Sequence, residues 1–216
     1  LHYAGPWSTH HNVILDRGAY IADRHGGAPY GIRYGTNPHH NLLKRVRQNG
    51  VSGTSGSDVY ANEVYVDSCA TNSFAISLYA LHNQEVQDNK VFGTGYLVVG
   101  YSATGSGAYD LDIHDNYAHL QAVKPDTRFD EYGAQSGAYC FRITSYGASL
   151  DNIVYHDNYG ITYGRHGGSD GMGGMVRGVW ITSDYNVTNC EFSDNVLKAV
   201  LTTMDTYTQG CVVHCG

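Results

Sequence analysis

The sequence is poor in charge and in basic residues, and these shortages narrow the functions that it can have. Only 15% of its 216 residues are charged, and 13 lysines and arginines against 20 acidic residues give a net charge of −7. A nucleic-acid-binding surface needs clustered basic residues, and the one basic run is Lys44-Arg45-Val46-Arg47. We therefore expect no nucleic-acid partner.

Long apolar stretches and helical periodicity are also missing. No run reaches the roughly 18 apolar residues that a membrane-spanning helix requires, so we expect no membrane span. No long window repeats apolar residues at the helical spacing, whereas short β-branched and aromatic runs alternate with Gly, Asn, Asp and Ser. With 27 glycines and 19 tyrosines, the composition favours an all-β domain. The chain begins at Leu1, and we expect it to be processed or part of a longer protein.

What the sequence does contain is a recurring short pattern: an apolar residue, any residue, and then Asp-Asn or a near copy of that pair. Ile113-His114-Asp115-Asn116 is one example, and the others are 86–89, 155–158, 192–195 and, in degenerate form, 46–49. Segments 14–17 and 65–68 fit the same frame. A strand that stops repeatedly at one kind of turn is typical of a solenoid, in which each repeat stacks on the next.

The last residue of each pattern serves as a register mark, and successive marks lie 19 to 42 residues apart. Stacked coils bring such marks into a column at the strand spacing of about 4.8 Å. Asparagine side chains in this column would bond to the coils above and below, and Asn tolerates the left-handed backbone that a tight turn needs. We therefore predict an asparagine ladder of Asn49, Asn89, Asn116, Asn158 and Asn195.

A second strand follows in most of the predicted coils, with copies at 31–34, 74–78, 96–99, 139–143 and 178–182. Alternation along these strands predicts which side chains point inward: Ile32, Ile76, Leu97 and Phe141. The same alternation predicts the outward side chains: Arg33, Ser77, Val98 and Arg142.

The repeated unit, apolar–x–x–Asn–x–apolar with a Gly-rich turn and a short strand, resembles the right-handed parallel β-helix superfamily, whose best-known members are pectate-lyase-like proteins. The resemblance covers residues 12–200 and points to no specific family. It implies a single-stranded right-handed parallel β-helix, a solenoid of about seven to eight coils, with 1–216 as one domain. It also implies that the long loops 18–29, 119–137 and 160–178 lie on one face.

Lyases of this superfamily use acidic residues to hold calcium against a uronate carboxylate, with a Lys or Arg as the base. The resemblance therefore places an active groove at the charged loop 124–131, with these candidate catalytic residues: Lys124, Asp126, Asp130 and Arg142. Candidate substrate contacts are Arg33, Tyr34, Ser77, His166 and Trp180. The alternative interpretation of the loop is a solvated segment with internal salt bridges.

The aspartates that precede the predicted ladder form a second column. Carboxylates stacked at strand spacing repel one another, and calcium binds such oxygens, so Asp88, Asp115 and Asp157 are candidate metal ligands. The alternative is that each aspartate caps its own turn. Of 12 histidines, His114 and His156 share one frame position and would be neighbours if their coils stack directly. We interpret the histidines as surface residues rather than as zinc ligands.

Three functions stay open. The first is an extracellular or cell-surface structural or adhesive module with polysaccharide contacts, whose partner is a second copy end to end, giving a filament, or a larger parent chain. The second is a polysaccharide-active enzyme, a lyase, hydrolase or epimerase, with a groove along one face. The third is a fragment resembling a phage tailspike. Exposed strand edges at the ends of a solenoid favour the first, because free edges pair with another chain.

Overall fold

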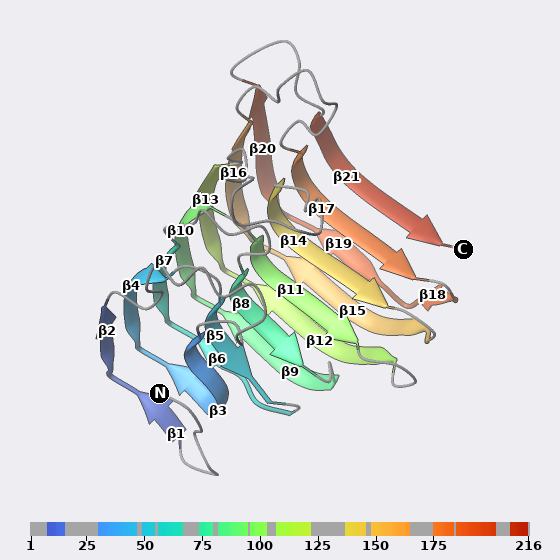
Figure 1. Ribbon diagram of the computed structural model, residues 1–216. Coiled ribbons are helices and arrows are strands. Elements are labelled where there is room, and N and C mark those ends of the chain that lie inside the picture. The colour runs from blue at the N-terminus through green and yellow to red at the C-terminus, as the bar shows by residue number, and fades with distance from the viewer. Residues whose placement is uncertain are drawn as a thin grey trace, which may run out of the picture.

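The computed structural model describes residues 8–15, 30–46, 49–54, 56–66, 74–79, 82–94, 96–102, 107–121, 137–145, 148–164, 175–183, 185–201 and 208–215. Within these ranges every regular element is a β-strand and no helix occurs (Figure 1). All neighbouring strands pair in parallel, as in β10 with β13 and β14 with β17. The prediction of an all-β chain is confirmed for this part of the molecule.

The strands lie on three faces (Figure 1). Face A contains β1 (Ser8–His10), the end of β3 (Tyr30–His39), β6 (Val59–Tyr60), β9 (His82–Gln87), β12 (Ala108–His114), β15 (Leu150–His156), β18 (Val187–Thr188) and β19 (Glu191–Ser193). Face B contains β2 (Val13–Leu15), β4 (Leu42–Val46), β7 (Glu63–Val66), β10 (Lys90–Thr94), β13 (Tyr117–Gln121), β16 (Tyr159–Gly164) and β20 (Val196–Leu201). Face C contains the start of β3, β5 (Asn49–Gly53), β8 (Phe74–Tyr79), β11 (Tyr96–Ser102), β14 (Gly137–Ser145), β17 (Met175–Ser183) and β21 (Thr208–Cys215).

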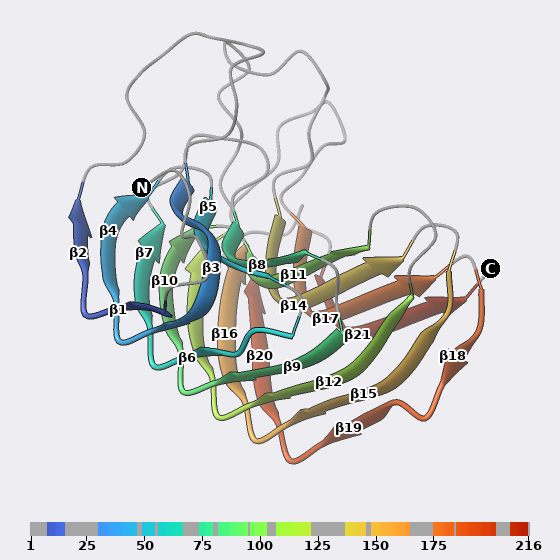
Figure 2. The same cartoon turned by 90° about the horizontal axis from the view of Figure 1, so that it is seen from below.

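The chain visits the faces in the repeated order A, B, C, and we call one such passage a circuit. Faces A and C join through β3 into one 14-stranded sheet, whereas face B is a separate 7-stranded sheet. From β9 onward the described circuits stay in register, so that residues of equal position form columns that cross the strands. In the first circuits the register shifts within three pairs: β1 with β3, β3 with β5, and β4 with β7. Figure 2 shows faces A and C running from face B on either side of a shared interior.

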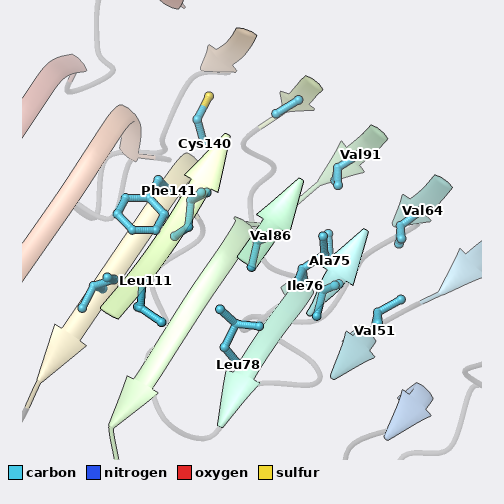
Figure 3. Close-up of a cluster of buried hydrophobic side chains, with 14 of the residues drawn as sticks. Val51, Val64, Ala75, Ile76, Leu78, Val86, Val91, Leu111, Cys140 and Phe141 are labelled. Carbon is cyan, nitrogen blue, oxygen red and sulfur yellow. The ribbon is translucent and has the colours of Figure 1, made fainter. Parts of the chain in front are cut away.

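Each face contributes columns of buried apolar side chains to that interior (Figure 3). One column of face A is Val59, Val86, Ile113 and Tyr155. One column of face B is Val64, Val91 and Ala118. One column of face C includes Val51, Ile76 and Phe141, and none of the residues named in these three columns is more than 1% exposed. Burying such a side chain contributes about 1.5–3 kcal/mol, so the stacked columns are the main source of stability.

The inward positions of face C differ in part from those that alternation predicts. Ile32, Ile76 and Phe141 are buried, as predicted. Val98, expected to point outward, is instead the register partner of Ile76 and Phe141, and Val99 is the partner of Ser77 and Arg142. Simple alternation does not hold on the neighbouring strands, because two successive residues are buried there: Ala75 with Ile76, and Cys140 with Phe141.

An asparagine ladder runs through the corner between faces A and B. Its members are Asn12, Asn41, Asn62, Asn89, Asn116, Asn158 and Asn195. Each Nδ2 donates to the Oδ1 of the next member over 2.9 to 3.1 Å. Each backbone N–H donates to the same oxygen over 2.9 to 3.2 Å. One oxygen therefore ties two donors of the neighbouring circuit, and no buried ladder amide is left unpaired.

The residue before each ladder asparagine has a left-handed backbone, with φ between 50° and 56°. In the later circuits this residue is Asp88, Asp115, Asp157 or Asp194. In the first three it is His11, His40 or Ala61. The sequence analysis assigned the left-handed conformation to the asparagine, and the structure assigns it to the preceding residue, which turns the chain so that the asparagine side chain enters the corner.

The predicted ladder contains four of the true members, Asn89, Asn116, Asn158 and Asn195, but Asn49 does not belong to it. Asn49 begins β5 on face C, where it pairs with Tyr30 and Phe74. Asn41 and Asn62 hold the corner instead, and each is followed two positions later by an inward residue of face B, Leu43 or Val64, as Asn89 is followed by Val91. The sequence search looked for Asp-Asn or a near copy of that pair, and the residues before Asn41 and Asn62 are His40 and Ala61.

Candidate functional site

Two identical tetrapeptides stack across the corner of the asparagine ladder. They are His114-Asp115-Asn116-Tyr117 and His156-Asp157-Asn158-Tyr159. His114 is the register partner of His156 on face A, and Tyr117 is the partner of Tyr159 on face B. Because the ladder fixes the asparagines between them, every residue of one tetrapeptide lies over its counterpart.

On the face A side, the two histidines form an array with four carboxylates. Nε2 of His114 lies 2.9 Å from Oε1 of Glu85, and its Nδ1 lies 2.8 Å from Oδ2 of Asp115. Nε2 of His156 lies 3.1 Å from Oδ1 of Asp112, and its Nδ1 lies 2.8 Å from Oδ2 of Asp157. The two rings stack with centroids 4.9 Å apart and planes 10° from parallel. We call these six residues the imidazole–carboxylate array.

The geometry of this array determines its protonation. A neutral imidazole donates from one nitrogen only, whereas an ionised carboxylate can only accept. Both nitrogens of His114 and of His156 face carboxylate oxygens. The arrangement is satisfied when both rings carry two protons, because a neutral ring would turn a lone pair toward a carboxylate.

The pKa values of the two histidines follow this geometry. Burial acts to lower the pKa of His114, but hydrogen bonds to Asp115 and Glu85 and the charge of Asp112 outweigh it, and the pKa is raised. The hydrogen bond to Asp157 raises the pKa of His156, against the effects of burial and of His114. Both rings therefore hold their second proton to a higher pH than an isolated histidine.

On the face B side, exposed and half-buried aromatic rings form a continuous stripe of Tyr65, Phe92, Tyr117 and Tyr159. Tyr65 stacks on Phe92 at 4.9 Å, and Tyr117 stacks on Tyr159 at 5.4 Å with planes 5° from parallel. Phe92 and Tyr117 join the two pairs at 5.6 Å in a tilted arrangement. Lys44 Nζ lies 5.5 Å from the centre of the Tyr65 ring. We call these four rings the aromatic stripe.

The structure describes only some of the residues predicted to line a groove on face C. Register aligns Ser77, Val99, Arg142 and Trp180 in one column that crosses face C. Arg33 follows Ile32, the partner of Val51, and is half-buried. Ser77, however, is only 3% exposed, which differs from the exposed groove that alternation predicts. The side chains of Tyr34, Arg142 and Trp180, and all of Lys124, Asp126, Asp130 and His166, lie outside the described residues.

Two of the three candidate calcium ligands contact imidazoles. Asp88, Asp115 and Asp157 each precede a ladder asparagine and so share one position in successive circuits. Asp115 and Asp157 accept hydrogen bonds from His114 and His156. In the described part of the chain, no group of three or more His, Cys, Asp or Glu side chains is arranged to hold a metal ion. Calcium binding at this column stays a prediction.

A second histidine cluster lies on the first circuits. His10 stacks on His39 at 4.9 Å, and His11 stacks on His40 at 5.1 Å. His39 also stacks on Tyr60 at 4.6 Å. These rings are exposed or half-buried, which agrees with their interpretation as surface residues.

The sequence analysis missed the paired tetrapeptides, although the signal was present. It noted that His114 and His156 share a frame position, but not that the identity continues to Tyr117 and Tyr159. The two ladder asparagines are 42 residues apart, so direct stacking of these circuits was not evident from the spacing.

Comparison with known proteins gives no match, because no family model, no curated protein and no solved structure is significantly similar to this chain. No helix in the described ranges is long and apolar enough to cross a membrane.

Proposed function

We propose that the chain is a right-handed parallel β-helix that serves as an extracellular or cell-surface structural or adhesive module and contacts glycans through its aromatic stripe. The observation that carries this proposal is the stripe itself, a series of stacked rings on an outer face next to a row of charged acceptors and donors. The function is non-catalytic, because binding along an extended flat surface requires no converging acid and base.

The repeated order of the faces supports the β-helix. Every circuit adds one parallel strand to each face, as β9, β10 and β11 are followed by β12, β13 and β14. One ladder asparagine marks each circuit. With one coil for each of the seven ladder asparagines in the described residues, the proposed β-helix would have a coil number within the seven to eight that the superfamily resemblance implies.

The chemistry of sugars matches the two sides of the corner. A pyranose ring presents an apolar face of C–H groups, which stacks on an aromatic ring, and a rim of hydroxyls, which donate and accept hydrogen bonds. Tyr159 is 42% exposed, so part of this residue is accessible to such a contact. The carboxylates of Asp115 and Asp157, which are more than half exposed, lie two residues before the tyrosines and can accept hydroxyl hydrogens.

A binding panel tests the proposal. Affinity electrophoresis through gels containing a neutral glucan, a galactan or a polyuronate would identify the retarding polymer, and calorimetry would measure its dissociation constant. The Tyr117→Ala/Tyr159→Ala variant should bind at least about tenfold more weakly, since each stacked ring contributes on the order of 1 kcal/mol. The matched control is Tyr185→Ala, which removes a 54% exposed ring outside the stripe. Equal binding by both variants, or no retardation by any polymer, would contradict the proposal.

One observation favours the enzyme as a second candidate. Ser77, Arg142 and Trp180 share one register column of face C, along which the groove of such an enzyme would run. A polysaccharide lyase would release unsaturated uronates, which absorb in the ultraviolet, and Arg142→Ala would abolish that signal while the fold is retained. A tailspike-like fragment, the third hypothesis, would form trimers, and the molar mass in solution tests it directly.

A further inference from the structure

Exposed apolar side chains gather at the two ends of the stack of circuits. Seven large hydrophobic residues are exposed in the described part of the chain, and five of them belong to the end circuits. Val13 (66%) and Leu15 (51%) lie on β2 of the first circuit. Tyr185 (54%), Phe192 (42%) and Val196 (59%) belong to the last circuit. Figure 1 shows β2 and the β18–β21 circuit at opposite ends.

Phe192 shows what the last circuit lacks. It continues the inward column of face A and stacks on Tyr155 at 4.8 Å with planes 6° from parallel. Tyr155, the preceding member, is 1% exposed, whereas Phe192 is 42% exposed. The difference arises because the last circuit, which contains Phe192, covers Tyr155. No further described circuit covers Phe192 in the same way. A core residue left open in this way favours a further layer.

The asparagine ladder ends in complementary groups. Asn158 donates from N and Nδ2 to Oδ1 of Asn195. Among the described residues, the backbone N–H of Asn195 has no acceptor, and Oδ1 of Asn12 receives no donor. The last circuit thus presents the donor of a ladder bond, and the first circuit presents the acceptor.

We infer that a second copy of this chain stacks head to tail, with the first circuit (8–15) of one copy on the last circuit (187–201) of the next. In the continued register, Asn12 follows Asn195, and apolar residues meet apolar residues: Val13 on Val196 and Ile14 on Leu197. His11 meets Asp194, which places an imidazole beside a carboxylate; both residues hold the left-handed position before a ladder asparagine. No like charges meet in these columns. The inference rests on the β-helix proposed above but not on glycan binding.

This contact does not close on itself. A head-to-tail interface uses two different surfaces, so each added copy leaves a new free end. Unless the rotation between copies closes the stack into a ring, it grows as a filament. Among the described strands, β2 pairs only with β4 and β20 only with β16, so association would also give each of these two edge strands a second partner.

Two end-blocking variants test the inference. Val13→Asp places a carboxylate on the first circuit, and Val196→Asp places one on the last, both at exposed positions where the fold tolerates it. Tyr109→Asp, at a 40% exposed ring in a middle circuit, is the matched control. The 216-residue chain and its variants would be compared by analytical ultracentrifugation over a hundredfold range of concentration, without glycan, with circular dichroism to verify the fold.

The expected pattern is specific. The unaltered chain and Tyr109→Asp form species larger than a dimer as concentration rises, and each end-blocked variant alone stays monomeric. An equimolar mixture of the two variants forms a one-to-one dimer, because each supplies the end that the other lacks. A monomeric unaltered chain, continued assembly of either variant, or a mixture that stays monomeric would overturn the inference. Glycan binding is measured in a separate experiment. A failure of head-to-tail stacking can therefore be told apart from a failure of glycan binding.

Discussion

The first circuits and the middle circuits build the same corner from different residues. In both regions a left-handed residue precedes a buried asparagine that bonds to the next one. The left-handed residue is histidine or alanine in the first circuits and aspartate in the middle ones. The corner therefore depends on the asparagine and on the backbone conformation before it. The aspartates are not required for the turn, which leaves Asp115 and Asp157 to bind the imidazoles.

The largest expected effect comes from breaking the ladder in a middle circuit. Asn116→Ala removes the oxygen that accepts from N and Nδ2 of Asn89, which leaves the buried backbone N–H of Asn89 unpaired. The substitution also removes the amide that donates to the carbonyls of Val86 and His114. We expect the free energy of unfolding, measured by urea titration, to fall by about 3 kcal/mol. Asn12→Ala, at the end rung, should lower it by only about 1 kcal/mol, because its oxygen accepts from no described donor. An equal fall in the free energy of unfolding for Asn116→Ala and Asn12→Ala would contradict the larger contribution expected from the middle rung.

A smaller effect on the free energy of unfolding is expected from a change of pH. It should arise in the middle circuits, where carboxylates contact His114 and His156. The folded-state pKa values of His114 and His156 are raised above the ordinary value of 6.5. Their contribution to stability is therefore fully present below about pH 6.5 and is lost as the pH rises through the folded-state values. Partly buried pairs of this kind contribute on the order of 1 kcal/mol.

Urea titrations between pH 5 and 9 would measure this loss. His114→Gln/His156→Gln should flatten the dependence, whereas His119→Gln, on the exposed side of face B in the same circuit, should retain it. A pH profile unchanged by the double substitution would show that the array does not contribute to stability. The groups that face the two rings from neighbouring strands are Glu85 and Gln87 on β9, Asp112 on β12 and Ser193 on β19.

The smallest effect should come from the left-handed position itself. Ala61 adopts φ 52° without a polar side chain to compensate, so Ala61→Gly should raise the free energy of unfolding by about 0.5–1 kcal/mol. Asp88→Gly, at φ 53°, should change it less, because Asp tolerates this conformation better than Ala. Thermal melting of the two variants beside the unaltered chain would compare them, and a larger gain at Asp88 would contradict the account.

Much of the fold could be predicted from the sequence, because in a stacked repeat the same sequence pattern occurs in many circuits. Strand type, parallel stacking and the later ladder rungs follow from the Asp-Asn pattern. The first rungs were missed because the turn requires a backbone conformation, which His40 and Ala61 also adopt, rather than a particular residue. A search for Asn followed two positions later by a buried apolar residue would have found Asn41 and Asn62.

The candidate site was less accessible, because its contacts join residues from different circuits. The bond from His156 to Asp112 depends on which circuits are neighbours, and loops of unequal length conceal that information. The column that includes Ser77 and Arg142 was predicted from alternation alone, but the burial of Ser77 was not, since alternation gives direction without saying what covers a side chain.

Side-chain amide hydrogen exchange tests the central claim, that one continuous ladder joins the first and middle circuits. Two-dimensional nuclear magnetic resonance of the uniformly labelled chain would follow the Nδ2 protons of Asn41, Asn62 and Asn116, with exposed Asn83 as the reference. The account predicts slow exchange at all three ladder positions and fast exchange at Asn83. Exchange at Asn41 and Asn62 as fast as at Asn83, with Asn116 protected, would contradict it.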